Sequence, residues 1–264
     1  MKIVLSLGGG VQSTTLLVMA IKGLLPKPDA AIFADTGWEP KAVYEHIERL
    51  KSVAEGRGIT FITCGKPTIR EDTLRSTLPS GQRAASLPFY TKDQSGKVGM
   101  IRRQCTEEYK LAPIRKAIRE QVLMVKTPPR SHSVDQWIGI STDEASRMRD
   151  SDVKYVRNVY PLIEMQFNRS QCIKWLSENG FPAVPKSACI GCPFHTDGQW
   201  VQIRHNKTEW DDACEFDEAI RKKNGHRGEL YLHRSGSPLR DTNLDHADEA
   251  THLWNQECTG MCGV

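Results

Sequence analysis

The stretch Ile3-Val4-Leu5-Ser6-Leu7-Gly8-Gly9-Gly10-Val11-Gln12-Ser13-Thr14 decides the fold. Its apolar start predicts a strand, its glycines predict a turn, and the apolar spacing of residues 16–21 predicts a helix. Glycines let a backbone turn sharply and approach an anion, and the first turn of a helix offers N–H groups and the positive end of its dipole. We therefore expect a phosphate-binding loop, with Ser13 and Thr14 adding hydroxyl donors. The alternative is an ordinary connection between a strand and a helix.

The segments that follow repeat the strand-and-helix alternation. Residues 30–34 and 59–63 are apolar runs typical of buried strands, and residues 40–54 between them carry apolar positions at helical spacing. Such an order predicts a doubly wound, mostly parallel α/β sheet of the Rossmann-like type, with helices on both faces. Ligands of these folds bind beyond the carboxyl ends of the strands. Residues 6–13, 35–38 and 64 are expected at such ends.

The rest of the chain is less regular. Residues 65–104 are rich in Pro, Gly, Ser and charge, which predicts a long functional or disordered loop. Further patterns predict helices at 107–121, 169–179 and 210–223 and a strand at 137–141. We divide the chain into an α/β domain, residues 1–184, and a Cys-containing C-terminal region, residues 185–264, packed against it.

Composition excludes several classes of protein. The 264 residues are 26% charged, and the mean hydropathy is −0.48, so transmembrane, collagenous and disordered proteins are excluded. The apolar start of the chain is too short for a signal peptide, which predicts a cytoplasmic protein without membrane contact. The net charge of +4 permits an anionic ligand without indicating a nucleic-acid-binding stripe. Eight cysteines in a cytoplasmic chain favour metal binding or catalysis over disulfides.

The glycine loop resembles the Ser-Gly-Gly-x-Asp-Ser motif of the PP-loop superfamily, and most closely its phosphoadenosine phosphosulfate reductase branch. Gln12 stands at the Asp position, where that branch often has Gln, and Gly8 replaces the first Ser, with Ser6 two residues upstream. The resemblance continues in order through residues 33–40, 105–114, 138–147, 160–163 and 189–193. It implies an adenine-nucleotide site formed by Ser6, Gly8, Gly9, Gly10, Gln12, Ser13, Thr14, Asp35, Thr36, Gly139 and Arg147.

Three cysteines are the candidate metal ligands. Cys189 and Cys192 are two residues apart, a spacing that lets both sulfurs reach one metal or cluster. Cys105 is the third, because related reductases with a [4Fe-4S] cluster carry a Cys-Cys pair at this place. Here Gln104 and Thr106 flank it, so one cluster iron stays open, or His195, Cys258 or Cys262 supplies the fourth ligand. Such a set would also suit Zn²⁺. Cys64, Cys172 and Cys214 are assigned to packing.

The end of the chain supplies candidate nucleophiles. Glu257-Cys258 resembles the start of the Glu-Cys-Gly-x-His tail of the reductases, although Thr259 replaces the Gly and the His is missing. Cys258 and Cys262 are therefore candidate catalytic thiols, and the alternative is a solvent-exposed terminus with incidental cysteines.

Polar residues complete the expected site. Asp35 would coordinate Mg²⁺ or bind the ribose, or it caps a helix; Lys110, Arg147 and Arg149 would neutralise phosphates, or they lie on solvated helix faces. Ser141 stands where sulfonucleotide reductases have an arginine that contacts the phosphosulfate, and this departure weakens the reductase hypothesis.

Three functions remain open at this point. The first is an ATP-using enzyme that cleaves ATP to AMP and pyrophosphate and activates a nucleotide, tRNA or DNA acceptor for sulfur transfer, with catalytic Asp35 and Lys110 and sulfur from the cluster, Cys258 or Cys262. The second is a phosphoadenosine or adenosine phosphosulfate reductase, in which Cys258 attacks sulfur. The third is a zinc-stabilised nucleotide- or nucleic-acid-binding module. A sulfur or electron donor is an expected partner, and we expect a homodimer.

Overall fold

The computed structural model describes residues 1–75, 87–222 and 228–244. Its centre is a parallel sheet of five strands in the order β3-β2-β1-β6-β7. The strands are β1 (Lys2–Ser6), β2 (Ala30–Asp35), β3 (Thr60–Gly65), β6 (Val134–Ile138) and β7 (Val156–Val159). The α/β, doubly wound fold predicted from the sequence is confirmed.

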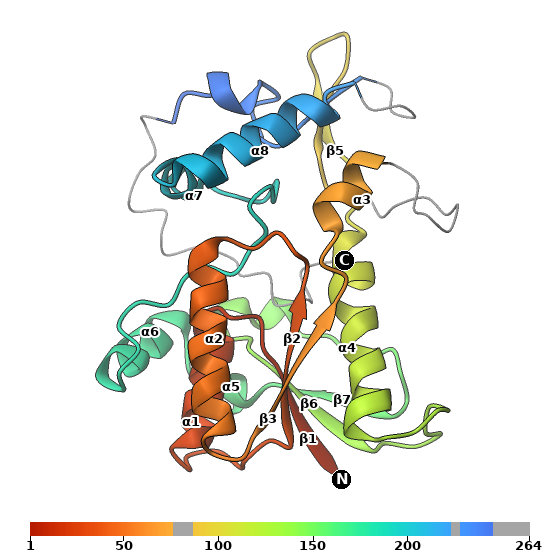
Figure 1. Ribbon diagram of the computed structural model, residues 1–264, viewed down its shortest axis with the longest axis vertical. Helices are drawn as coiled ribbons and strands as arrows, with labels where there is room; N and C mark the ends of the chain where they lie inside the picture. Colours follow the sequence, from red (N-terminus) through yellow and green to blue (C-terminus); the bar gives the residue numbers. More distant parts are fainter. Residues whose placement is uncertain (76–86, 223–227, 245–264) are drawn as a thin grey trace.

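Helices cover both faces of the sheet (Figure 1). On one face lie α1 (Val11–Ile21), α2 (Lys41–Glu55), α5 (Pro161–Glu164) and α6 (Arg169–Glu178). On the other face a single long helix consists of η1 (Glu107–Leu111), α4 (Ala112–Ala117) and η2 (Ile118–Val122). Because strand β2 is apolar and buried throughout residues 30–34, it needs this cover on both sides.

The remaining elements form an upper lobe above the carboxyl ends of the strands (Figure 1). It contains α3 (Ile69–Arg75), α7 (Asp197–Arg204), α8 (Lys207–Ile220), η4 (Leu239–Asp241) and a small antiparallel sheet of β4 (Tyr90–Lys92), β5 (Val98–Met100) and β8 (Glu229–Tyr231). Its core unites Leu87 and Phe89 with Trp200 and Phe216. Residues from both sides of position 184 thus share one core, and the division of the chain there stays a prediction.

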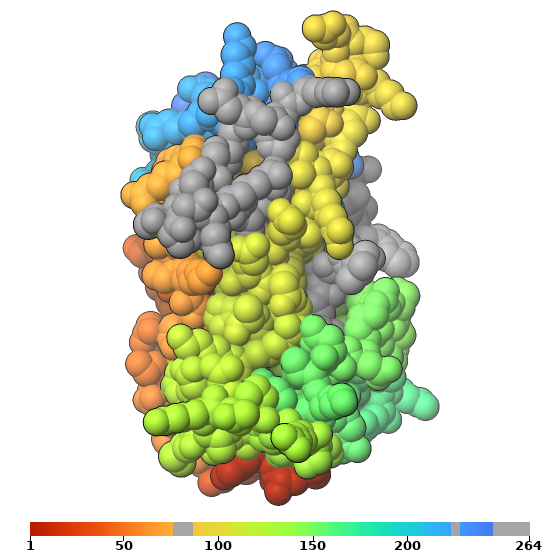
Figure 2. Space-filling model, turned by 90° about the vertical axis from the view of Figure 1, so that its right-hand side faces the viewer, coloured from red at the N-terminus to blue at the C-terminus, as the bar shows by residue number. Residues whose placement is uncertain are grey.

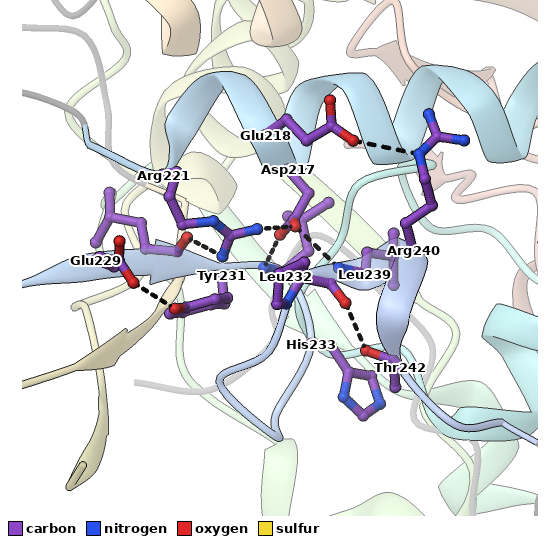
Figure 3. A network of polar contacts seen from close by, with 12 residues as sticks. Asp217, Glu218, Arg221, Glu229, Tyr231, Leu232, His233, Leu239, Arg240 and Thr242 are labelled. Atoms are coloured by element: carbon purple, nitrogen blue, oxygen red, sulfur yellow. Dashed lines mark hydrogen bonds and ion pairs between the residues drawn. The ribbon is translucent and has the colours of Figure 1, made fainter.

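A buried carboxylate connects several elements of the upper lobe (Figure 3). Asp217 on α8 is fully buried and accepts hydrogen bonds from the backbone N–H groups of Leu232, at 2.7 Å, and Leu239, at 3.0 Å. It also forms an ion pair with Arg221, whose guanidinium donates to the carbonyl of Leu230 at 2.9 Å. One side chain therefore joins α8 to β8 and to the start of η4.

Several element boundaries differ from the sequence predictions. The strand expected at 137–141 lies at 134–138, because its ladder with β1 ends at the pair Ser6–Ile138, where the glycine turn begins. The long irregular loop contains α3 and the β4–β5 hairpin, whose three-residue strands are too short to show a period. Strand β7 and helix α7 were not predicted. No described helix combines the length and apolarity needed to cross a membrane.

Candidate functional site

The glycine loop lies at the carboxyl end of β1. Gly10 is the N-cap of α1, and Gly9 has φ +79°, a conformation that favours glycine. A Cβ on Gly9 would also lie 2.9 Å from the Cδ1 atom of Ile47. Position 9 must therefore be glycine. This allows α1 to begin after Gly10 and to pack against α2.

The loop also meets the end of β6. A Cβ on Gly139 would lie 2.7 Å from the backbone nitrogen of Ser13, so the chain after β6 passes directly beside the first turn of α1. Strands β2 and β6 flank β1 on opposite sides, which makes the β1–β6 boundary the switch point of the sheet. Ligands of open parallel sheets bind at such points.

Gln12 ties the loop to the segment after β6. Its side chain is fully buried and donates to Glu144, at 2.7 Å, and to Ser141, at 3.3 Å, while Arg169 donates to its oxygen at 2.9 Å. Glu144, on η3 (Thr142–Arg147), in turn forms an ion pair with Arg147. Gln12 thus connects Arg147 to the loop.

The predicted hydroxyl donors also have partners within the chain. Ser13 donates to the carbonyl of Gly10 at 3.3 Å, and Thr14 Oγ1 lies 3.0 Å from His46 Nε2. Burial, aided by the nearby charge of Arg49, lowers the pKa of His46 to about 4. His46 is therefore neutral at pH 7.

Asp35 closes the turn after β2. Its Oδ1 atom accepts hydrogen bonds from the backbone N–H of Gly37, at 2.7 Å, and from the hydroxyl of Tyr44, at 2.9 Å. Burial raises the pKa of Tyr44 well above its usual range, so Tyr44 remains a donor. These contacts give Asp35 a structural role at the turn. Both hydrogen bonds are accepted by Oδ1, and the Oδ2 atom takes part in neither.

Three predicted cysteines lie together. Cys105, Cys189 and Cys192 line one cavity, with Thr36 and Lys110 beside them. We call this the thiol cavity; its other lining residues are Ile69, Leu87, Pro88, Arg103, Thr106, Pro193 and Phe194. Segments far apart in the sequence thus bring their thiols to one place, next to the residue that follows β2.

A carboxylate that the sequence pattern did not single out lies beside these thiols. Glu39 is buried, and its Oε1 atom lies 3.5 Å from Lys110 Nζ and accepts from Cys189 Sγ at 3.7 Å. Thr36 Oγ1 lies 3.2 Å from the same sulfur. Burial, together with the Glu39 charge, raises the pKa of Cys189 well above its usual range. An acidic residue between Trp38 and Pro40, just beyond the carboxyl end of a predicted strand, was the available clue.

The donor set of the thiol cavity consists of three cysteine sulfurs, which suit an iron–sulfur cluster and, with a further ligand, also suit Zn²⁺. In the part of the chain that the structure describes, no three Cys, His, Asp or Glu side chains are close enough to hold one metal ion. Zn²⁺ is held by three or four such ligands around one centre. Iron–sulfur clusters take cysteine thiolates, each on its own iron, so the sulfurs need not converge on one atom.

The other candidate metal ligands differ in where they lie and in what they contact. Both ring nitrogens of His195 have partners, because Nε2 lies 2.9 Å from the carbonyl oxygen of Cys189 and Nδ1 lies 3.3 Å from Gln199 Oε1. Burial lowers the pKa of His195 to about 4. Cys258 and Cys262 lie outside the described residues. Cys172 and Cys214 are buried in helices, as expected for packing residues.

A parallel α/β sheet with a glycine loop at its switch point is typical of nucleotide-binding proteins. Within that class, a family model described as "Phosphoadenosine phosphosulfate reductase domain" matches residues 2–185, and the chain belongs to this family of the PP-loop superfamily.

Other comparisons show less. A crystal structure of phosphoadenylyl-sulfate (PAPS) reductase from Candida auris, in a phosphate complex, is similar at 14% sequence identity and a TM-score of 0.39, covering 71% of this chain and 75% of that one. No curated protein matches the chain.

Proposed function

We propose that this chain is an ATP-using enzyme that prepares a nucleotide or nucleic-acid acceptor for sulfur transfer and holds a [4Fe-4S] cluster on Cys105, Cys189 and Cys192. The observation that carries the proposal is the meeting of these three thiols in one cavity with Lys110. Membership of a family of sulfonucleotide enzymes supports sulfur chemistry as the class of reaction. The expected homodimer and cytoplasmic location remain predictions.

The proposed reaction has two steps. A carbonyl oxygen of the acceptor attacks the α-phosphorus of ATP, and pyrophosphate leaves; a sulfide from a sulfur donor then adds to the activated carbon, and AMP leaves. The glycine loop and Arg147 would stabilise the negative charge of the phosphates, and Asp35 would bind Mg²⁺. The cluster, when bound, would supply an iron site that holds the sulfide.

The buried charges of the thiol cavity suit this chemistry. Ligands of an iron–sulfur cluster must be thiolates, so loading the site releases protons. Lys110 would stabilise these thiolates, and Glu39 is positioned to accept the proton of Cys189. Cys258 or Cys262 would complete the set or act as the nucleophile.

Family membership favours phosphosulfate reduction as the second candidate function. There Cys258 would attack the substrate's sulfur, the nucleotide would leave, and a second thiol would release sulfite. Ser141 is the residue that argues against a reductase function, because it stands in place of the expected arginine. It hydrogen-bonds to Gln12.

The two candidates differ in their products. The anaerobically purified protein is incubated with ATP, Mg²⁺, a sulfide donor and a mixture of nucleotides and tRNA, and separately with a phosphosulfate and a dithiol. Pyrophosphate release in the first incubation, lost in Lys110→Gln and kept in Lys116→Gln, supports the proposal. Sulfite in the second incubation, with no pyrophosphate in the first, would assign the chain to the reductases.

A further inference from the structure

A cavity of about 640 Å³ lies on the sheet face that carries α4, and we call it the arginine cavity. Its walls come from the long helix and the segment before it, from the last two residues of η3 and residues 149–153 beyond it, and from strands β6 and β7. Figure 2 looks onto this side of the molecule, where the yellow-green helix and the green segment lie next to each other. The volume is that of a small-molecule site.

The floor of the cavity carries a buried amide. Gln136, on β6, is only 6% exposed and lines the cavity, and its side chain has no hydrogen-bond partner among the described residues. Its register partner on β7, Asn158, lines the cavity too and donates to the carbonyl of Arg149 at 2.9 Å. Buried amides are normally hydrogen-bonded, so Gln136 offers a donor and an acceptor to a ligand.

The walls of the cavity are basic. Five arginines and three carboxylates line it. Arg115 is neutralised by Glu107, at 2.7 Å, and Asp152, at 2.6 Å. Arg149 instead donates to two backbone carbonyls, at 2.7 and 2.9 Å, which leaves its charge available to an anion.

The arginine cavity adjoins the thiol cavity. Arg103 and Thr106 line both, and Cys105 lies between them in the sequence. A ligand that fills the arginine cavity would therefore have one end next to the thiols. Arg147, which connects to the glycine loop through Glu144 and Gln12, lines the same cavity.

We propose that the arginine cavity binds the acceptor as a nucleoside 5′-phosphate unit, with the Gln136 amide paired to the edge of the base and Arg149 paired to the phosphate. An amide matches a base edge that carries a donor beside an acceptor, as glutamine does with adenine. Arginine matches a phosphate through two parallel hydrogen bonds. This inference rests on the proposed function, whose acceptor it specifies.

The test measures binding by equilibrium dialysis with the four ribonucleoside monophosphates, ribose 5-phosphate, single-stranded oligonucleotides and ATP. Gln136→Leu keeps the side-chain size and removes the amide. We expect it to weaken binding of at least one monophosphate about fivefold or more and to leave ribose 5-phosphate unchanged. Arg149→Gln should weaken both ligands, and the exposed Arg130→Gln serves as the matched control.

The outcomes are distinguishable. Gln136-dependent binding of oligonucleotides alone would support the base site and identify a nucleic acid as its source. Equal binding by wild type and Gln136→Leu for every ligand, or monophosphate binding that ATP abolishes by competition, would overturn the inference. A chain that fails to bind ATP at all, yet shows Gln136-dependent monophosphate binding, would instead contradict the proposed function.

Discussion

At the residue scale, Gln12 has a role in the structure that differs from the one that the motif predicts. The family motif suggests a side chain directed at the nucleotide, whereas here Gln12 hydrogen-bonds to Ser141, Glu144 and Arg169. Its contribution is to position the loop against the segment that follows β6. Neither Glu144 nor Arg169 could be assigned to it from the sequence, because each is more than 130 residues away.

Gln12→Leu should destabilise the protein by about 1–3 kcal/mol, because it leaves buried polar partners with fewer hydrogen bonds. Denaturant unfolding measures this change. The variant should also bind ATP more weakly, since Arg147 loses its link to the loop. Gln121→Leu, at an exposed position, is the control, and equal stability of the two variants would contradict the role assigned to Gln12.

His46 makes stability depend on pH. Its pKa is about 4 in the folded protein, mainly because of burial, and its ordinary value is 6.5. Between these values the unfolded chain binds a proton that the folded protein does not, so stability falls as pH drops from 6.5 towards 4. His46→Gln should lose less stability than wild type between pH 7 and pH 5 in thermal unfolding. A parallel loss in both proteins would show that His46 does not contribute.

At the element scale, the contact between α1 and the end of β6 positions the loop. Gly139→Ala places a Cβ 2.7 Å from the nitrogen of Ser13, and a backbone atom cannot move aside cheaply. We expect lower thermal stability and weaker ATP binding in calorimetric titration. Gly23 has open space around it but φ +78°, so Gly23→Ala is also strained; it tests whether lost stability alone weakens ATP binding.

The elements that could be predicted are those with a clear hydrophobic pattern. Strands β1, β2 and β3 and helices α1 and α2 follow from apolar runs and helical spacing. The predicted bounds of strand β6 were three residues too far along the chain, because Asp135 and Gln136 are polar. Asp135 is ion-paired to Arg157 on β7, and Gln136 lines the arginine cavity. Polar residues that make tertiary contacts interrupt the apolar run by which a strand is predicted from sequence.

At the scale of the whole molecule, one buried carboxylate joins α8 to β8 and η4 in the upper lobe. Asp217→Ala leaves Arg221 and two backbone N–H groups without their acceptor, which should cost about 3–5 kcal/mol. Hydrogen exchange should show lost protection in α8 and β8, with the strands of the parallel sheet unchanged. Asp211→Ala, which removes partly exposed ion pairs with Lys207 on the same helix and with Arg240 on η4, should leave protection intact.

The candidate site also shows what a sequence can and cannot supply. The cysteines were predicted as a group because their spacing and order resemble a family, and the fold places three of them in one cavity. Glu39 and Gln136 were not predicted, since each gains its role only when distant segments meet. Side chains of this kind need the tertiary structure.

The proposed chemistry depends on Cys105, Cys189 and Cys192 forming one cluster site. The most direct measurement is iron and acid-labile sulfide content after anaerobic purification, in wild type, in Cys105→Ser and in the control Cys64→Ser, whose thiol lies outside the thiol cavity. We expect about four irons and four sulfides per chain in wild type and control, and a large loss of both in Cys105→Ser. Wild-type protein without iron and sulfide, or Cys105→Ser with the full content, would contradict it.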